Sequence, residues 1–250
     1  MKRIKPYDVP HKGLRHALSQ LSLSAGRTDY SDRQQVAELH RLGTRVFSIL
    51  SIHAEDENSV TLAHLETRCP GAAEHDLDDH ERIHSLQDNL ERLLAEIYDG
   101  SAKGKDLSEA GGEFYIAFSE FHGQYLLHTA EEERVTQPLL WQYFTDEELA
   151  GHRKEIMARN PPPTLLTWLR FVIPAQTHAE RKNLLAGVKQ MAPAAFFAEA
   201  MSVIEKVLSV PDFQRLQDDR MPATHAVSSE SAGKLSPGPA TPCGPEVGQG

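Results

Sequence analysis

The sequence has 250 residues, 40% of them hydrophobic, which is enough for one sizeable core. The formal net charge is −10, and Lys and Arg are scattered among acidic residues rather than gathered into a stripe, so we expect no nucleic-acid partner. Two cysteines and the lack of a long uncharged apolar run predict no disulfide framework, no thiolate metal site and no membrane span. Without a visible export signal either, we expect a cytoplasmic protein.

Helical periodicity runs from residue 11 to about residue 216 and strong strand signals are missing, so we predict an all-α protein. The first helix begins near Pro10. The second begins after Ser31 or Asp32 and ends at the Cys69-Pro70-Gly71 turn. Its predicted inward stripe is Leu39, Leu42, Val46, Ile49, His53, Glu57, Val60 and His64. We interpret His64, one heptad beyond Glu57, as a core histidine rather than a ligand.

A third helix is predicted from about Glu74 to Tyr98, with His80, Ile83, Gln87, Leu90, Leu94 and Ile97 in phase. The fourth follows a loop that ends near Gly112, and its spacing is typical of the seam of a bundle helix. Its inward positions are Phe114, Phe118, Phe121, Tyr125, His128, Glu132, Val135 and Leu139.

After Trp141 the pattern changes to shorter helices, the first capped by Thr145 and the others near 164–174, 178–191 and 194–208. From Pro222 to Gly250 the composition is dominated by Pro, Gly, Ser, Ala and Thr, which cannot repay the entropy of ordering. We therefore divide the chain into a helical domain at 1–143, an accessory helical region at 144–220 and a disordered tail at 221–250.

An internal echo carries the functional signal. The segment His53-Ala-Glu-Asp-Glu57-Asn-Ser-Val-Thr61 returns 75 residues later as His128-Thr-Ala-Glu-Glu132-Glu-Arg-Val-Thr136. A helical residue and its fourth successor lie about 40° apart around the axis and about 6 Å apart along it, so His and Glu at this spacing can reach one inward site. Two such helices could hold a pair of metal ions between them.

The polar residues of the echo fall on stripes otherwise built from apolar side chains, and a buried carboxylate demands a partner. His11 and His80 are also in phase with the core stripes of their own helices. The four predicted helices therefore read His, His-x-x-x-Glu, His and His-x-x-x-Glu. Bound metal ions would compensate all of these groups at once.

Over residues 7 to 143 these motifs resemble the His/His-Glu cation-binding branch of the hemerythrin-like family. The resemblance implies an up-down-up-down four-helix bundle that holds two non-haem irons, with additional C-terminal helices in this chain. It implies His11, His53, His80 and His128 as terminal ligands and Glu57 and Glu132 as bridges. The oxygen carriers of the family also have a His-x-x-x-His pair on the third helix, which would make His84 a further ligand.

The resemblance implies diiron chemistry with dioxygen or hydrogen peroxide, including catalase-like decomposition of peroxide. The carriers use His followed five residues later by Asp in the fourth helix, whereas Glu132 lies four residues after His128. This departure weakens the carrier interpretation. A non-catalytic iron or oxygen sensor stays an alternative, and no protein partner can be inferred from the residues.

A second alternative comes from His80-Glu81-Arg-Ile-His84, which matches the His-Glu-x-x-His signature of zinc peptidases. In those enzymes the two histidines bind zinc and the Glu activates water. Arg82 places a charge inside the motif, and the sheet that normally flanks such a helix is not predicted here. These features count against zinc proteolysis.

Overall fold

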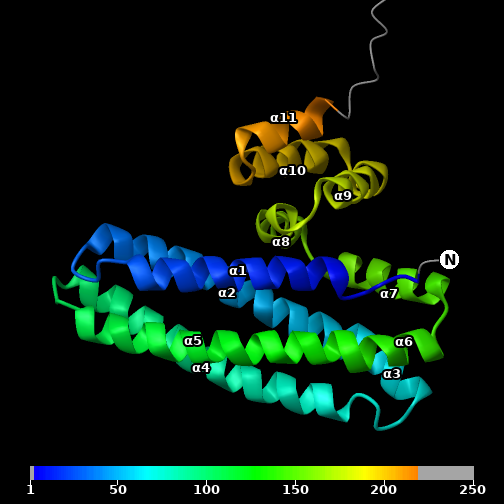
Figure 1. Cartoon of the computed structure of the whole chain (residues 1–250), viewed down its shortest axis with the longest axis horizontal. Helices are drawn as coiled ribbons and strands as arrows, with labels where there is room; N and C mark the ends of the chain where they lie inside the picture. The colour runs from blue at the N-terminus through cyan, green and yellow to red at the C-terminus, as the bar shows by residue number, and fades with distance from the viewer. Residues whose placement is uncertain (1–2, 219–250) are drawn as a thin grey trace, which may run out of the picture.

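The computed structural model describes residues 3–218, and every regular element among them is helical. The long helices are α1 (Asp8–Arg27), α2 (Arg33–Asp56), α4 (Glu74–Ala102) and α5 (Ser108–Glu131). Figure 1 shows them lying lengthwise beside one another, and in the order α1, α2, α4, α5 each contacts the next, with α5 returning to α1. The all-α prediction is confirmed for the described residues. The tail predicted at 221–250 lies outside them.

The interior between the four long helices holds one apolar core because their inward stripes meet there. Its largest fully buried side chains come from α1, α2 and α5, among them Leu14, Leu18, Leu39, Ile49, Phe114 and Phe118. Leu90, Leu94 and Ile97 of α4 close the fourth side. Burial of large apolar side chains is worth about 1.5–3 kcal/mol each before entropy, which makes this cluster the main stabilising feature of the fold.

Two short π-helical segments interrupt the long helices at equivalent places, η1 (Glu57–Thr61) after α2 and η2 (Glu132–Thr136) after α5. The helices resume as α3 (Leu62–Arg68) and α6 (Gln137–Tyr143). A π-helical turn contains an extra residue and so shifts the phase of every later side chain. Glu57 and Glu132, the glutamates of the two His-x-x-x-Glu pairs, each stand at the first position of a π segment.

The phase shift corrects three sequence predictions. Thr136 at the end of η2 and Gln137 and Leu140 after it are buried, whereas Val135, predicted to face inward, is 50% exposed. Leu139 is only partly buried. Beyond η1 Leu65 is buried, and His64, predicted in the core, is half-exposed and pairs with Glu155 instead. These predictions assumed a regular α-helical period throughout, whereas each helix contains one inserted residue in its π segment.

The remaining helices are α7 (Asp146–Arg159), α8 (Pro162–Ala175), α9 (His178–Met191), α10 (Ala194–Val207) and α11 (Val210–Asp218). Thr145 caps α7 as predicted, in a capping box with Glu148. Leu149 of α7 packs with Tyr7, Leu65 and Leu140 at one end of the long helices.

Helix α8 lies against α1, and Figure 1 shows α9, α10 and α11 on its far side. A second core of seven buried residues joins α8 to these helices, namely Leu169, Ile173, Leu185, Ala200, Val203, Ile204 and Leu216. Gly13 permits the close approach of α1 and α8, because a Cβ there would stand 2.7 Å from Cγ2 of Val172. No helix within residues 3–218 is long and apolar enough to cross a membrane.

Candidate metal centre

Six side chains from all four long helical rods converge in the core. Each is no more than 5% exposed: His11 of α1, His53 at the end of α2, Glu57 opening η1, His80 of α4, His128 near the end of α5 and Glu132 opening η2. These six residues are called the His/Glu cluster below. They are six of the seven residues that the sequence motifs single out.

The first half of the His/Glu cluster joins α1 and α2. Nε2 of His53 lies 3.1 Å from Oε1 of Glu57, and Nε2 of His11 lies 3.9 Å from the same oxygen. Nε2 of His11 also lies 3.3 Å from Oε2 of Glu132. Ligand atoms of His11, His53, Glu57 and Glu132 all lie within 4.8 Å of one another, so this group could hold a metal ion.

The second half joins α4 and α5. Nε2 of His80 lies 3.4 Å from Oε2 of Glu57 and 3.5 Å from Oε1 of Glu132. Nε2 of His128 lies 3.5 Å from that same Glu132 oxygen. Each glutamate therefore turns one oxygen toward both histidines of one half and its other oxygen toward one histidine of the other half, His80 for Glu57 and His11 for Glu132.

Burial without partners makes the His/Glu cluster fit a metal. Among the described residues, both carboxylate oxygens of Glu57 and Glu132, and Nε2 of His11, His53 and His80, are buried and have no hydrogen-bond partner. A buried polar atom left without a partner costs about 1–3 kcal/mol. Metal ions accept lone pairs from imidazole nitrogen and carboxylate oxygen, so bound ions would satisfy these atoms together.

The glutamates of the metal-free cluster differ electrostatically. Burial, and then the charge of Glu57, raise the pKa of Glu132 to about 8. Burial also raises the pKa of Glu57, but His53, His11 and His80 outweigh it and hold that pKa well below its usual range. One of the two carboxyls thus carries a proton at neutral pH in the metal-free protein and the other does not.

The histidines divide in the same way. Burial lowers the pKa of His11 and His80, but neighbouring carboxylates outweigh it. The hydrogen bond to Glu133 and the nearby Glu57 raise the pKa of His11 to about 9, and the nearby Glu132 and Glu57 raise that of His80 to about 10. Burial lowers the pKa of His53 to about 3 and, with the charge of His80, the pKa of His128 to about 4. Loading the cluster with metal must displace the protons that this network holds.

Three of the histidines are held from behind through Nδ1. The Nδ1–H of His11 donates to Oε1 of Glu133 at 3.0 Å, and the Nδ1–H of His80 donates to Oδ1 of Asn58 at 2.6 Å. Nδ1 of His128 lies 3.4 Å from Oδ2 of Asp79. Such partners fix the ring and leave Nε2 free to bind a metal.

The sequence motifs do not single out these supporting residues, although each is adjacent to a predicted ligand. Asn58 and Glu133 directly follow Glu57 and Glu132, and Asp79 directly precedes His80. An adjacent residue normally points away from an inward side chain. The π segments change that relation for Asn58 and Glu133, and only the structure reveals them.

The structure places His84 outside the His/Glu cluster. Its side chain is 63% exposed, and Nε2 lies 3.8 Å from a carboxylate oxygen of Asp88 on the same helix. The prediction of His84 as a ligand is therefore corrected. The zinc-peptidase interpretation loses its basis too, because His80 faces the core and His84 faces solvent. Residues four apart differ by about 40° around a helix, and here that rotation crosses the edge of the buried stripe.

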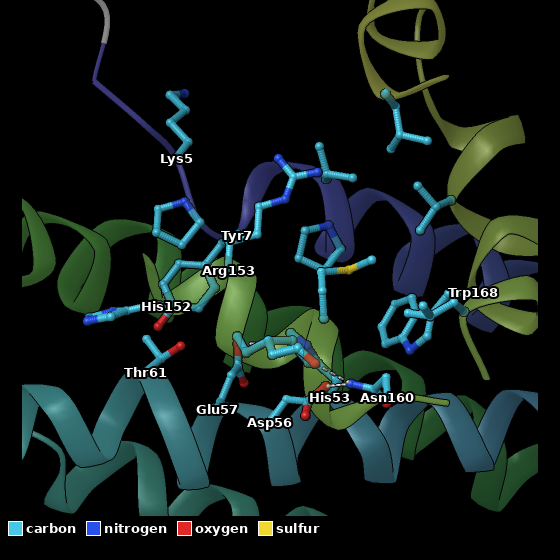
Figure 2. A pocket seen from close by; sticks show the side chains of 18 of the residues that line it. Lys5, Tyr7, His53, Asp56, Glu57, Thr61, His152, Arg153, Asn160 and Trp168 are labelled. Carbon is cyan, nitrogen blue, oxygen red and sulfur yellow. Dashed lines mark hydrogen bonds and ion pairs between the residues drawn. The ribbon is translucent and has the colours of Figure 1, made fainter. Parts of the chain in front are cut away.

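A cavity of about 240 Å³ adjoins the first half of the cluster, between the start of α1 and helices α7 to α10. His53 and Glu57 line its inner end, with Tyr7 and Thr61 beside them (Figure 2). The ring of Tyr7 stacks on that of His11 at a centroid distance of 4.8 Å, and its buried hydroxyl has no partner within residues 3–218. The cavity therefore offers a route to this half of the cluster.

The threonines that end the two copies of the echo, Thr61 and Thr136, have different surroundings. Oγ1 of Thr136 donates to Oδ2 of buried Asp76 at 2.6 Å, whereas Thr61 lines the cavity. Neither His80 nor His128 is among the residues that line it. The cavity therefore reaches the first copy of the repeat, at His53 and Glu57, but does not reach His128 of the second copy.

Comparisons with known proteins give a weak similarity. No family model matches the sequence, and no solved structure matches it. F-box/LRR-repeat protein 5 of Mus musculus is 22% identical over 157 residues, which cover 62% of this chain and 21% of that protein. The same protein of Bos taurus is 22% identical over 162 residues, covering 64% and 22%. The chain thus spans about a fifth of the length of these relatives.

Proposed function

We propose that this chain is a hemerythrin-like protein, in which an up-down-up-down four-helix bundle of α1, α2, α4 and α5 binds two iron ions. In this proposal the protein reacts with, or senses, dioxygen or hydrogen peroxide. The observation that carries it is the division of the oxygens of Glu57 and Glu132 between two pairs of buried histidines. A carboxylate with one oxygen toward each of two histidine pairs is arranged as a bridging ligand.

The ligand chemistry favours iron over the alkaline-earth and thiolate-preferring metals. Four imidazoles and two carboxylates form a mixed nitrogen and oxygen set, which suits iron, whereas Mg²⁺ and Ca²⁺ prefer oxygen alone. No cysteine belongs to either metal-ligand group of the described residues. When bound, two neighbouring irons supply the capacity to exchange two electrons with an O–O unit.

The protein's own residues would select what reaches the ions. His53 and Glu57 border the cavity, so a small molecule arrives at the half of the cluster that His11 and His53 form. Phe121 and Tyr125 are buried on the turns before His128 and exclude water from the other half. The supporting contacts of Asn58 and Glu133 hold the imidazoles in position throughout.

The test is the metal content of protein from iron-replete cells, measured by mass spectrometry together with optical absorption. We expect two irons per chain in the wild type and in His84→Ala, which removes an exposed histidine from the same helix as His80. His53→Ala should lose iron loading. Two irons retained in His53→Ala, or one zinc and no iron in the wild type, would refute the proposal.

Peroxide consumption then separates an enzyme from a sensor. Rapid turnover by the iron-loaded wild type, absent from His53→Ala, would identify a peroxide-decomposing enzyme. Stable iron without turnover would identify a sensor or carrier, whose output is the change in stability that metal occupancy brings.

A further inference from the structure

The cavity beside His53 and Glu57 is larger than dioxygen or peroxide requires. Its volume is about 240 Å³. Because a water molecule takes about 30 Å³ of liquid, the space matches roughly eight groups of that size. A methylene group is similar in size, so a chain of about eight carbon atoms would fill the cavity. Access for dioxygen or hydrogen peroxide alone does not account for this space.

The outer walls of the cavity are apolar. They are formed by Leu165, Trp168 and Val172 of α8, Leu184 and Val188 of α9, and Phe196 of α10. The ring of Trp168 lies 6.1 Å from that of His53 by centroids, so the apolar wall continues to the His/Glu cluster. Figure 2 shows Trp168 on one wall and His53 and Glu57 at the inner end. An alkyl chain suits these walls.

Two cations complete the lining. Lys5 precedes α1 and Arg153 belongs to α7; both are exposed. Neither has an ion pair or hydrogen bond among the described residues. In Figure 2 Lys5 lies on the opposite side of the cavity from Glu57 and His53. Cations that line an apolar cavity and have no partner among the described residues are complementary to an anionic headgroup.

The acidic residues of the cavity do not cancel this charge. Asp56 accepts a hydrogen bond from Asn160 at 2.7 Å and lies 3.7 Å from Nε of Arg159, so it already has partners. Glu57 faces His53, His11 and His80 at the inner end. The cavity therefore presents apolar surface together with positive charge that has no partner within residues 3–218.

We propose that this cavity binds a small organic anion with a straight apolar chain of about eight carbon atoms. Lys5 and Arg153 hold its carboxylate, and the chain lies against Trp168 and the apolar side chains of α8 and α9. The occupant covers the approach to His53 and Glu57, so it controls which small molecules reach the cluster. This last step rests on the proposed function, whereas the binding itself does not.

The experiment is calorimetric titration of the full chain with octanoate, once in chelator and once after iron loading. We expect one octanoate per chain in both states, and each methylene removed from the ligand should weaken binding by about fourfold. Octylamine, with the same tail and a cationic head, should bind at least about tenfold more weakly. A chain that takes up no iron during loading but still binds octanoate would refute the proposed function and leave this inference standing.

The headgroup assignment is tested by Lys5→Ala combined with Arg153→Ala, which changes only exposed side chains. We expect octanoate to bind about tenfold more weakly to this double variant. The control is Lys154→Ala, an exposed cation beside Arg153 in α7 that does not line the cavity, and its loss should be less than about twofold. Equal losses in the two variants, or equal binding of octylamine and octanoate, would overturn the proposal. So would octanoate binding that requires iron and is matched by acetate, because the head would then be on the metal.

The apolar assignment is tested by Val188→Trp, which fills the cavity from its partly exposed α9 wall. Octanoate binding should be lost while the circular dichroism of the helices is unchanged. Retained binding in a folded Val188→Trp variant would place octanoate elsewhere and overturn the proposal. In iron-loaded wild-type protein, saturating octanoate should slow the binding of azide, and an unchanged rate would refute control of access.

Discussion

Replacing Glu132 by Gln should stabilise the metal-free protein even though it removes a predicted metal ligand. Glu132 is fully buried, and its pKa is raised from 4.5 to about 8 by burial and then by Glu57. Between these two pKa values the folded state keeps a proton that the unfolded state has lost, so stability falls as pH rises through this window. The loss is about 1.4 kcal/mol per pH unit, or up to about 3 kcal/mol at pH 7. Gln has nearly the shape of the neutral acid and carries no such penalty.

Glu57→Gln has the opposite expected effect, which makes it the matched control. Glu57 is the ionised carboxyl of the metal-free cluster, and it lies beside His11, His53 and His80. Its removal takes away the buried anion that compensates protonated His11 and His80. Breaking a buried pair in this way costs about 3–5 kcal/mol. Two chemically identical substitutions should therefore change stability in opposite directions.

Urea unfolding in excess chelator, followed by circular dichroism, measures both variants. At pH 7 Glu132→Gln should be more stable than the wild type, and its advantage should shrink as the pH is lowered toward 4.5. A Glu132→Gln variant less stable than the wild type at pH 7, or an advantage independent of pH, would refute this electrostatic account. Free iron at about 100 times its Kd should stabilise the wild type by about 2.7 kcal/mol and leave both variants unchanged.

Asn58→Ala removes the acceptor of the hydrogen bond from Nδ1–H of His80 and should weaken metal binding by about 10- to 100-fold with the fold intact. Competition with a metal-binding dye measures this affinity, and an unchanged affinity would contradict the supporting role of Asn58. Because the metal-free pKa values of His11 and His80 are raised to about 9 and about 10, both are protonated at pH 8, and metal binding there should release at least about two protons. Calorimetry in buffers of different ionisation enthalpy counts these protons, and affinity should rise with pH up to about 10; release of none would disprove the assignment. Gly13→Ala places a Cβ against the side chain and backbone of Val172 in α8, so it should destabilise the protein by about 1–3 kcal/mol in urea unfolding. In Gly112→Ala the added Cβ meets nothing within 4 Å, so this variant should be more stable than the wild type by about 0.5–1 kcal/mol.

The local sequence was sufficient to predict the helices and most of the candidate site. Apolar side chains recur every three or four residues, and this spacing defines one inward face for each long helix. His11, His53, His80 and His128 fall on those faces with Glu57 and Glu132, and the structure brings all six together. The identity of the metal and the reaction it supports stay predictions.

Helical periodicity could not locate the π segments, because one inserted residue changes no composition and little local propensity. A regular helix would place Val135 and Leu139 on the inward face. The shift caused by the π segment exposes Val135 and buries Thr136 and Leu140 instead. Both segments begin at a glutamate of the His/Glu cluster, so the interruption coincides with the proposed site. Extra residues of this kind are frequent at functional positions in helices.

By itself, then, the sequence determined the helices, their inward faces and the repeated His-x-x-x-Glu pairs, because these depend on spacing along one element. Only the tertiary structure shows where the buried face of each helix ends. On α4 it buries His80 within the His/Glu cluster and leaves His84 exposed outside it. The cavity too depends on the tertiary structure, because Lys5, Arg153 and Trp168 line one space only when α8 packs against α1 and α7 packs against η1. Spacing governs neighbours on one helix, whereas contacts between helices depend on how the whole chain folds.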